Sequence, residues 1–151
     1  SVALWECMQD FRERMERFNI NCTVLAEFLS VHLAVDFVYH PSLNSHSSYD
    51  FAKKLLSGNG GVVSFTLEDE SENALKKFYD REFSSMIKAP SIGSNQTLIC
   101  PYTLLTNYFY TDEELKEIKL PRHLIRISAG CETEIDGILE DLDFALKRTI
   151  Q

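Results

Sequence analysis

The segment HLIRIS, residues 123–128, places an arginine between two isoleucines in a run that is typical of a strand. Successive side chains of a strand point to opposite faces, so Ile125 and Ile127 share one face and Arg126 lies on the other. A guanidinium is always charged, is costly to bury without an anion, and presents a planar fork of donors that matches a carboxylate. We therefore predict that Arg126 faces away from the core and binds an anion; the alternative is an ordinary surface or cross-strand arginine.

The other reactive side chains form no recognisable catalytic or metal-binding motif. His40 and His46 lie in a loop-like segment with no cysteine or carboxylate at ligand spacing. The sequence contains no Gly-x-Ser-x-Gly elbow, Walker loop or Gly-x-Gly-x-x-Gly turn. Four acidic residues near the C-terminus spread around a polar helix face rather than pairing: Glu134, Glu140, Asp141 and Asp143. We predict that the chain alone carries no metal site and no catalytic residue.

The cysteines also argue against a zinc site or a redox pair. They are widely scattered and none belongs to a Cys-x-x-Cys motif: Cys7, Cys22, Cys100 and Cys131. We expect reduced, buried thiols.

Composition predicts one globular domain and restricts its partners. The chain has 151 residues, of which 44% are hydrophobic, and a net charge of -8. With 23 acidic against 15 basic side chains, it lacks the basic surface that nucleic acids or anionic membranes require. No apolar run approaches the roughly 20 residues that span a bilayer, and no leader precedes a cleavage site. We expect a cytoplasmic protein without nucleic-acid or membrane partners.

The arginine strand needs a scaffold, and the hydrophobic pattern predicts an α+β domain. Apolar residues recur at helical spacing through a long first segment: Leu4, Met8, Phe11, Met15, Phe18, Cys22, Leu25 and Leu29. Strands are expected at 35–40, 62–67, 83–89 and 123–128, whereas 98–101 is too short to classify. These elements predict about four mostly antiparallel strands with helices packed on one face of the sheet.

Further helices are expected between and after the strands. Capping boxes are expected at Asp69 with Glu72 and at Thr111 with Glu114, and Ser47 or Ser48 is expected to cap a helix through YDFAKKLL. The segment after 98–101 could be a strand end or a helical turn. A last helix is expected to begin near residue 133.

Four ordered segments then resemble a known enzyme family. VYHPSLNSH, GNGGVVSFTL, PSIGSNQTLICPYTLLT and LIRISAGCETEIDGILEDLDFAL occur in this order within residues 10–148. They are similar to the C-terminal part of the pyridoxal-phosphate enzymes of cysteine and methionine metabolism. That family includes cystathionine γ-synthase, cystathionine γ- and β-lyases, methionine γ-lyase and O-acetylhomoserine sulfhydrylase. The corresponding family pattern is S-L-G-G-x-E-[ST]-L, followed in the γ-synthases by a segment like L-I-C-H-A-A-T-M-T-H, and finally L-[IVL]-R-[IL]-S-x-G-[IL]-E.

The resemblance implies roles for three residues of this chain. Arg126 falls on the arginine that binds the substrate α-carboxylate, which agrees with the anion role expected from its strand. Ser91 falls on the serine of S-L-G-G, placed near the substrate carboxylate and the cofactor lysine. Thr106 falls on the threonine of M-T-H, with a supporting hydrogen-bond role. The chain departs from the pattern at four positions, which affects the choice of substrate and subfamily: Ser94, Gln96, Asn107 and Cys131.

The same resemblance implies that a larger upstream domain is absent. In the family the Schiff-base lysine lies in an S-x-[TH]-K motif, which no lysine here follows, including Lys53, Lys54, Lys76, Lys77 and Lys88. The cofactor supplies the electron sink, so a chain without its lysine is not expected to catalyse the reaction. We interpret residues 1–30 as a long linking helix and 31–151 as the C-terminal α+β domain.

The expected parent is a transsulfuration-type enzyme that binds pyridoxal phosphate and acts on sulfur-containing or homoserine-derived amino acids. A slight lean towards the γ-synthases comes from TLICPYTLLT. The expected partners are an amino-acid substrate, the upstream domain and, in the parent, further copies of the chain. In this chain alone we expect no bound cofactor, no activity, and Arg126 facing solvent. The alternative is a non-catalytic amino-acid-binding or association module, or a degenerate paralogue.

Overall fold

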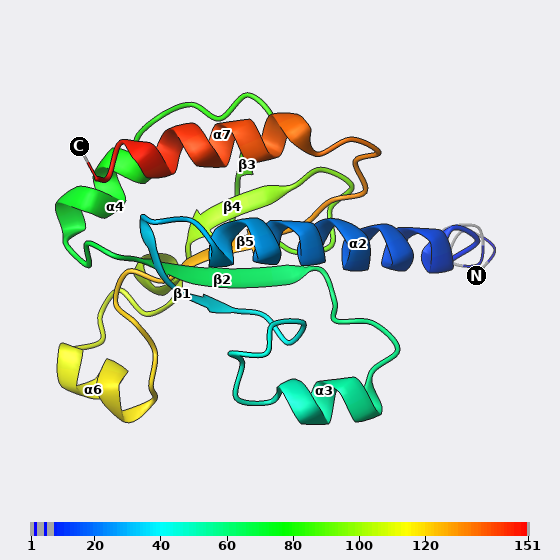
Figure 1. Cartoon of the computed structure of the whole chain (residues 1–151), viewed down its shortest axis with the longest axis horizontal. Coiled ribbons are helices and arrows are strands. Elements are labelled where there is room, and N and C mark those ends of the chain that lie inside the picture. Colours follow the sequence, from blue (N-terminus) through cyan, green and yellow to red (C-terminus); the bar gives the residue numbers. More distant parts are fainter. Residues whose placement is uncertain (1, 3–4, 6–7, 151) are drawn as a thin grey trace.

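A five-stranded sheet forms the centre of the structure, which is a computed structural model that describes residues 2, 5 and 8–150. From one edge to the other the strands are β1 (Val35–Tyr39), β2 (Val62–Leu67), β5 (Ile125–Ser128), β4 (Leu98–Pro101) and β3 (Ile87–Lys88). All neighbouring pairs are antiparallel except β3 with β4 (Figure 1). The predicted α+β class with mostly antiparallel strands is confirmed.

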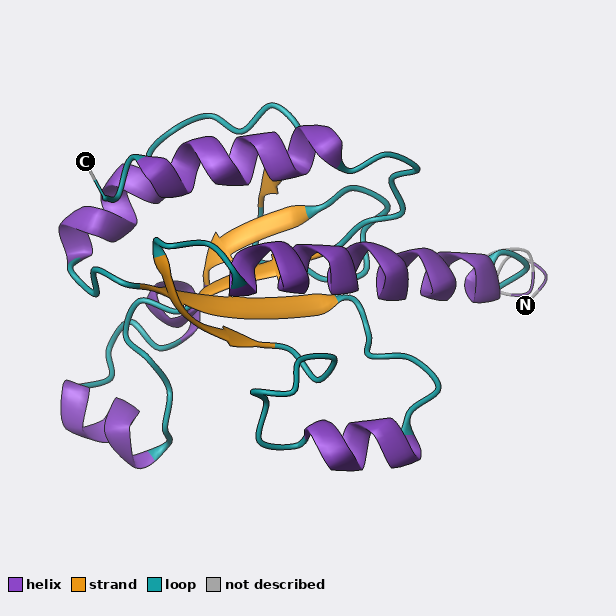
Figure 2. Cartoon of the chain, viewed as in Figure 1, coloured by secondary structure: helices purple, strands orange, loops and turns teal. Residues whose placement is uncertain are grey.

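Three helices build the core with the sheet, and three shorter ones lie around it (Figure 2). The core-forming helices are α2 (Phe11–Ser30), α4 (Glu72–Tyr79) and α7 (Asp136–Lys147). The shorter ones are α3 (Tyr49–Leu55), α5 (Tyr102–Thr106) and α6 (Asp112–Glu117). In Figure 1, α7 lies above the strands, whereas α3 and α6 lie below them. Helix α5 follows β4 directly and contacts β4 and β5.

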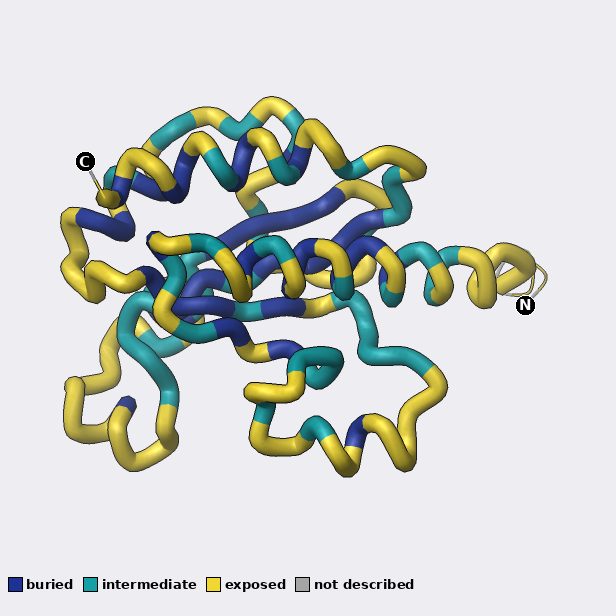
Figure 3. Tube along the Cα trace, in the orientation of Figure 1, coloured by how far each residue is buried: buried dark blue, intermediate teal, exposed yellow. Residues whose placement is uncertain are grey.

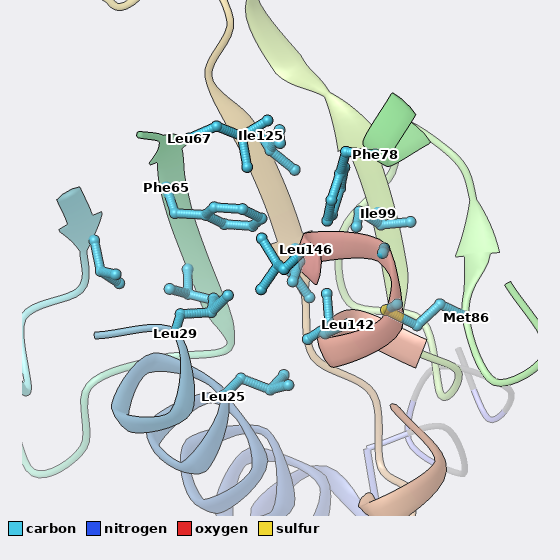
Figure 4. Packing of buried hydrophobic residues seen from close by; sticks show 14 of the residues in the cluster. Leu25, Leu29, Phe65, Leu67, Phe78, Met86, Ile99, Ile125, Leu142 and Leu146 are labelled. Carbon is cyan, nitrogen blue, oxygen red and sulfur yellow. The ribbon is translucent and has the colours of Figure 1, made fainter. Parts of the chain in front are cut away.

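The hydrophobic core lies between the sheet and helices α2, α4 and α7 (Figure 4). Alternate residues of the central strands point into it, among them Phe65, Ile99, Ile125 and Ile127. Phe78 of α4 meets Phe65 edge to face, with ring centroids 5.8 Å apart. Each fully buried aromatic or branched aliphatic side chain of this kind contributes about 1.5–3 kcal/mol by leaving water. The period-two pattern of β5 thus anchors the strand that carries Arg126.

Helix α2 carries the predicted apolar stripe, but only its C-terminal half packs on the sheet. The buried part of the stripe consists of Phe18, Cys22, Leu25 and Leu29. Phe11 and Met8 are 53% and 57% exposed, because this end of the chain projects beyond the sheet (Figure 3). Leu4 lies outside the described residues. The predicted linking role of 1–30 and the domain boundary at residue 31 stay predictions.

One predicted strand is much shorter than expected, and one unclassified segment is a strand. Only Ile87–Lys88 of the segment 83–89 pairs as a strand, because the preceding residues bind α7 instead. Ser85 donates its backbone N–H to Asp141 at 2.8 Å, and the Ser84 hydroxyl reaches the same carboxylate at 3.1 Å. The segment 98–101, too short to classify from its sequence, is the strand β4 between β5 and β3.

The helix starts give mixed results. Thr111 and Glu114 form the predicted capping box of α6. The box expected at Asp69 and Glu72 is wrong: Ser71 caps α4 by accepting the Ala74 N–H, while Asp69 accepts the N–H of Ser71.

Two further helix predictions need correction. Ser48 occupies the N-cap position of α3, but its side chain makes no capping hydrogen bond. The last helix begins at Asp136 rather than near residue 133. None of the helices in the described part of the chain combines the length and apolarity needed to cross a bilayer.

Candidate functional site

Arg126 occupies the middle of the sheet, on the face opposite the core. Its strand β5 lies between β2 and β4, and the register places Ser64 and Cys100 beside Arg126. Ile125 and Ile127 are fully buried on the other face, as the alternation predicts. The prediction that Arg126 points away from the core is confirmed.

The guanidinium is partly exposed, but some of its donors already have partners within the chain. Its Nη2 donates to the backbone carbonyls of Pro90 and Ser91, at 3.0 Å in the second case. The ring of Tyr102 faces it, with 4.9 Å between Cζ and the ring centroid. A loop and the first residue of α5 therefore enclose Arg126, which is half-buried.

Arg126 has no carboxylate counter-ion within the described part of the chain. Its Nε is buried and has no hydrogen-bond partner there. Neutral carbonyl oxygens and an aromatic face offset only part of the cost of burying a positive charge. The arrangement therefore favours an incoming anion, and a carboxylate matches the planar donors of the guanidinium best.

The loop that contacts Arg126, residues 90–96, is also bonded to the C-terminal end of β5 and the segment after it. The N–H of Gly93 donates to the Ser128 hydroxyl at 3.2 Å. Gly93 has φ of +73°, a left-handed conformation that glycine adopts without strain. Cys131 donates its N–H to the Asn95 carbonyl at 2.8 Å, so both ends of this part of the loop are fixed.

A buried hydrogen-bond network supports the segment just after β5. The Glu132 carboxylate accepts the backbone N–H and the hydroxyl of Thr97, the hydroxyl at 3.0 Å. The Asn21 side chain of α2 donates to the carbonyls of Gly130 and Glu132, both at 3.0 Å. This network joins α2, β4 and β5, and it holds the turn beside the Arg126 loop in one arrangement.

Thr106 lies one helical turn beyond the residue that faces Arg126. Its hydroxyl is 2.9 Å from the carbonyl oxygen of Tyr102 and 2.6 Å from Oδ1 of Asn107. Thr106 is exposed, so its hydroxyl could contact a molecule bound near α5. Ser91 therefore contacts Arg126 directly, whereas Thr106 is linked to it only through Tyr102 at the start of α5.

The thiol of Cys100 lies on the Arg126 face of β4 but is not an activated nucleophile. Burial raises the pKa of Cys100 above its ordinary value, and the Arg126 guanidinium opposes this effect more weakly. A neutral, buried thiol is inert towards electrophiles. Cys22 is also buried, as expected; Cys131 is only half-buried, contrary to the expectation, and Cys7 lies outside the described residues.

Tyr102 is the site residue that the sequence did not reveal. It stands in PYTLLT, a segment that fitted a strand end as well as a helical turn, and only a helix start here turns its ring towards Arg126. The neighbouring loop carbonyls were equally hidden, because backbone oxygens leave no mark in residue types. The pairing of β4 with β5, which places Cys100 beside Arg126, is the feature that brings the segment after Cys100 close to the arginine.

The lysines, one of which would carry pyridoxal phosphate as a Schiff base, make their contacts elsewhere among the described residues. Several lysines are engaged at the surface: Lys76 pairs with Glu72 at 2.7 Å, Lys147 with Asp143 at 2.6 Å, and Lys88 lies over the ring of Tyr79. None of the contacts among the described residues brings a lysine to Arg126, and no described cluster of His, Cys, Asp and Glu has metal-ligand geometry. The planar donors of Arg126 suit a planar anion such as a carboxylate.

Two surface hollows lie elsewhere. One of about 390 Å³ is lined by residues of β2, α6 and the segment before β5, including Glu70, Lys116 and His123. The other, of about 370 Å³, lies between the start of α2 and Cys131. Neither is lined by Arg126, Ser91 or Thr106.

Comparison with known proteins gives these features a context. The family model described as Cys/Met metabolism PLP-dependent enzyme matches residues 2–147. Cystathionine beta-lyase of Lactococcus lactis subsp. cremoris (strain MG1363) is 39% identical over 135 residues, which cover 89% of this chain and 34% of that protein. L-methionine gamma-lyase of Fusobacterium nucleatum subsp. polymorphum is 32% identical over 141 residues, which cover 93% and 35%.

A solved structure agrees with the sequence comparison. Cystathionine gamma synthase from Xanthomonas oryzae pv. oryzae, in complex with cystathionine, matches with a TM-score of 0.84 at 29% identity. The match covers 93% of this chain and 36% of that one. The chain therefore spans about one third of the length of the relatives it matches.

Proposed function

The chain belongs to the family of Cys/Met metabolism PLP-dependent enzymes, and we propose that it is the C-terminal domain of a transsulfuration-type member. Its relatives named above include a cystathionine β-lyase, a methionine γ-lyase and a cystathionine γ-synthase. The proposed substrates are therefore sulfur-containing or homoserine-derived amino acids. The cytoplasmic location expected from the sequence stays a prediction.

The observation that carries the proposal is the state of Arg126. Its guanidinium is half-buried on the open face of the sheet, has a buried Nε without a partner, and has no carboxylate beside it among the described residues. We assign it the substrate α-carboxylate, which would fix the amino acid in one orientation. Such fixation converts binding energy into correct placement of the reacting bond.

Ser91 and Thr106 have supporting roles in this proposal. Ser91 holds Nη2 of Arg126 through its carbonyl and stands at the start of the loop that the substrate would meet. The exposed Thr106 hydroxyl lies on α5, next to the arginine's aromatic neighbour, and would donate to a carboxylate oxygen in place of the Tyr102 carbonyl that now accepts its proton. Both residues act by positioning, without taking part in bond making.

The chemistry itself belongs to the cofactor, because pyridoxal phosphate is the electron sink of this family. In our proposal the upstream domain holds it and presents it to the Arg126 face, and the parent protein forms homo-oligomers. By itself this chain would bind amino acids weakly and catalyse nothing.

The test uses the full-length protein that contains this chain, purified with pyridoxal phosphate. It is assayed with cystathionine, with methionine, and with O-acetylhomoserine plus cysteine, and products are quantified by mass spectrometry. We expect turnover of at least one of the three. A folded protein that binds the cofactor but converts none of them would contradict the proposed substrate class. Amino-acid binding without cofactor binding would instead support the non-catalytic alternative.

A further inference from the structure

The guanidinium of Arg126 is restrained on two sides by different parts of the chain. In its plane, Nη2 donates to the carbonyls of Pro90 and Ser91. Across its flat face, the ring of Tyr102 lies 4.9 Å from Cζ. The structure records no partner for Nη1 among the described residues, so this nitrogen offers free donors next to those already used. The ring and the loop together determine where an anion can approach.

Tyr102 is itself held firmly. It is the first residue of α5, and Pro101 before it pairs with Ile125 in the ladder between β4 and β5. The next residue, Thr103, is buried and donates its hydroxyl to the Pro121 carbonyl at 2.7 Å. The backbone on both sides of Tyr102 is thereby tied to the strand that carries Arg126 or to the segment leading into it. The backbone is therefore fixed at the point where the ring of Tyr102 faces the guanidinium.

We propose that Tyr102 is a positioning residue for the carboxylate-binding arginine. Its ring closes one face of the guanidinium and fixes the plane of the donors, so that a carboxylate binds in that plane through the free donors of Nη1. This inference rests on the proposed function, because it assumes that Arg126 binds the substrate carboxylate. In this proposal the aromatic ring of Tyr102 positions the guanidinium, and the Tyr102 hydroxyl has no role.

The size of the effect follows from the contact. The ring contacts the guanidinium before and after a carboxylate binds, so its effect on affinity comes only from holding the donors in one plane, on the scale of one partly exposed cation–π contact. Removing the ring while keeping an apolar side chain is therefore expected to weaken carboxylate binding about fivefold. A phenylalanine keeps the ring and is expected to keep the affinity.

The experiment measures binding to the full-length protein by calorimetric titration with two ligands. Norleucine has the α-carboxylate but no sulfur leaving group, and norleucinamide is its α-carboxamide. The variants are Tyr102→Leu, Tyr102→Phe and, as the reference for the arginine, Arg126→Gln. We expect Tyr102→Leu to weaken norleucine binding about fivefold, to leave norleucinamide binding unchanged, and to be rescued by Tyr102→Phe.

The outcomes separate this inference from the proposed function. If Arg126→Gln weakens norleucine binding and Tyr102→Leu does not, the role of Tyr102 is wrong while that of Arg126 stands. If Tyr102→Leu weakens both ligands equally, the residue is merely structural and the inference is overturned. If Arg126→Gln leaves norleucine binding unchanged, the carboxylate role of Arg126 fails and the inference fails with it.

Discussion

Replacing Asp141 by asparagine should destabilise the domain far more than its single lost charge suggests. The Asp141 carboxylate is only 6% exposed and lies on α7, where it faces the segment between α4 and β3. It accepts the N–H of Ser85 at 2.8 Å and the hydroxyl of Ser84 at 3.1 Å, and it pairs with Arg81 at 3.4 Å. Asparagine keeps the shape but removes the charge, so Arg81 loses its counter-ion.

The magnitude follows from what remains after the change. Breaking a buried ion pair costs about 3–5 kcal/mol when the surviving charge is left without partners. Arg81 is not left so: it is 18% exposed, donates to the Asp141 backbone carbonyl at 3.1 Å, and lies over the ring of Phe144 at 4.5 Å. We therefore expect a loss of about 2–3 kcal/mol in the free energy of unfolding, or roughly 5–10 °C in Tm.

The assay is urea unfolding of the 151-residue chain at pH 7, followed by far-UV circular dichroism. Asp143→Asn is the matched control, because it lies on the same helix and pairs with Lys147 at 2.6 Å and with the neutral or charged ring of His32 at 3.5 Å. An exposed pair of this spacing contributes about 0.3–0.5 kcal/mol. If the two variants lose the same free energy, the network around Asp141 does not hold α7 to the sheet and our reasoning is refuted.

Two further predictions concern a buried histidine and a crowded glycine. Burial, aided by the nearby charge of His46, lowers the pKa of the fully buried His40 from 6.5 to about 4. The neutral ring therefore stabilises the fold fully above pH 6.5, and this stabilisation is lost as the pH falls towards 4. This loss is about 3 kcal/mol between pH 6.5 and pH 4. Over that range the free energy of unfolding of His40→Gln should fall less steeply than that of the wild type. Parallel pH profiles of the two proteins would exclude a contribution from His40. A Cβ at Gly130 would lie 2.5 Å from the Asn95 carbonyl oxygen and 2.6 Å from the Gln96 carbonyl carbon. Gly130→Ala should therefore lower the free energy of unfolding by about 2–3 kcal/mol. An unchanged midpoint in chemical unfolding would contradict this prediction.

The fold was predictable wherever hydrophobic spacing was long and regular. The stripe of α2 and the alternation of β2 and β5 identified their buried faces, because burial of one face is what such patterns encode. The strand β4 could not be identified, because four residues are too few to show an alternating pattern. The segment 83–89 was overextended because its tie to Asp141 depends on a helix some 55 positions further along the chain.

The site was predictable only in part, for a related reason. An arginine in mid-strand is visible as a misfit of charge and pattern, so the residue types alone single out Arg126. Its surroundings are made by the carbonyls of Pro90 and Ser91 and by the ring of Tyr102, which come from a loop and a helix start with no pattern of their own. These neighbours of the arginine could not be predicted, because the contacts arise only in three dimensions.

The central claim is that Arg126 binds a substrate carboxylate, and one comparison tests it most directly. The affinities of the full-length protein for norleucine and for norleucinamide are measured by calorimetric titration in wild type and in Arg126→Gln. A hydrogen bond between two charged groups is worth about 1.5–3 kcal/mol, so we expect Arg126→Gln to weaken norleucine binding at least about tenfold and to leave norleucinamide binding nearly unchanged. Equal weakening of both ligands, or of neither, would contradict the claim.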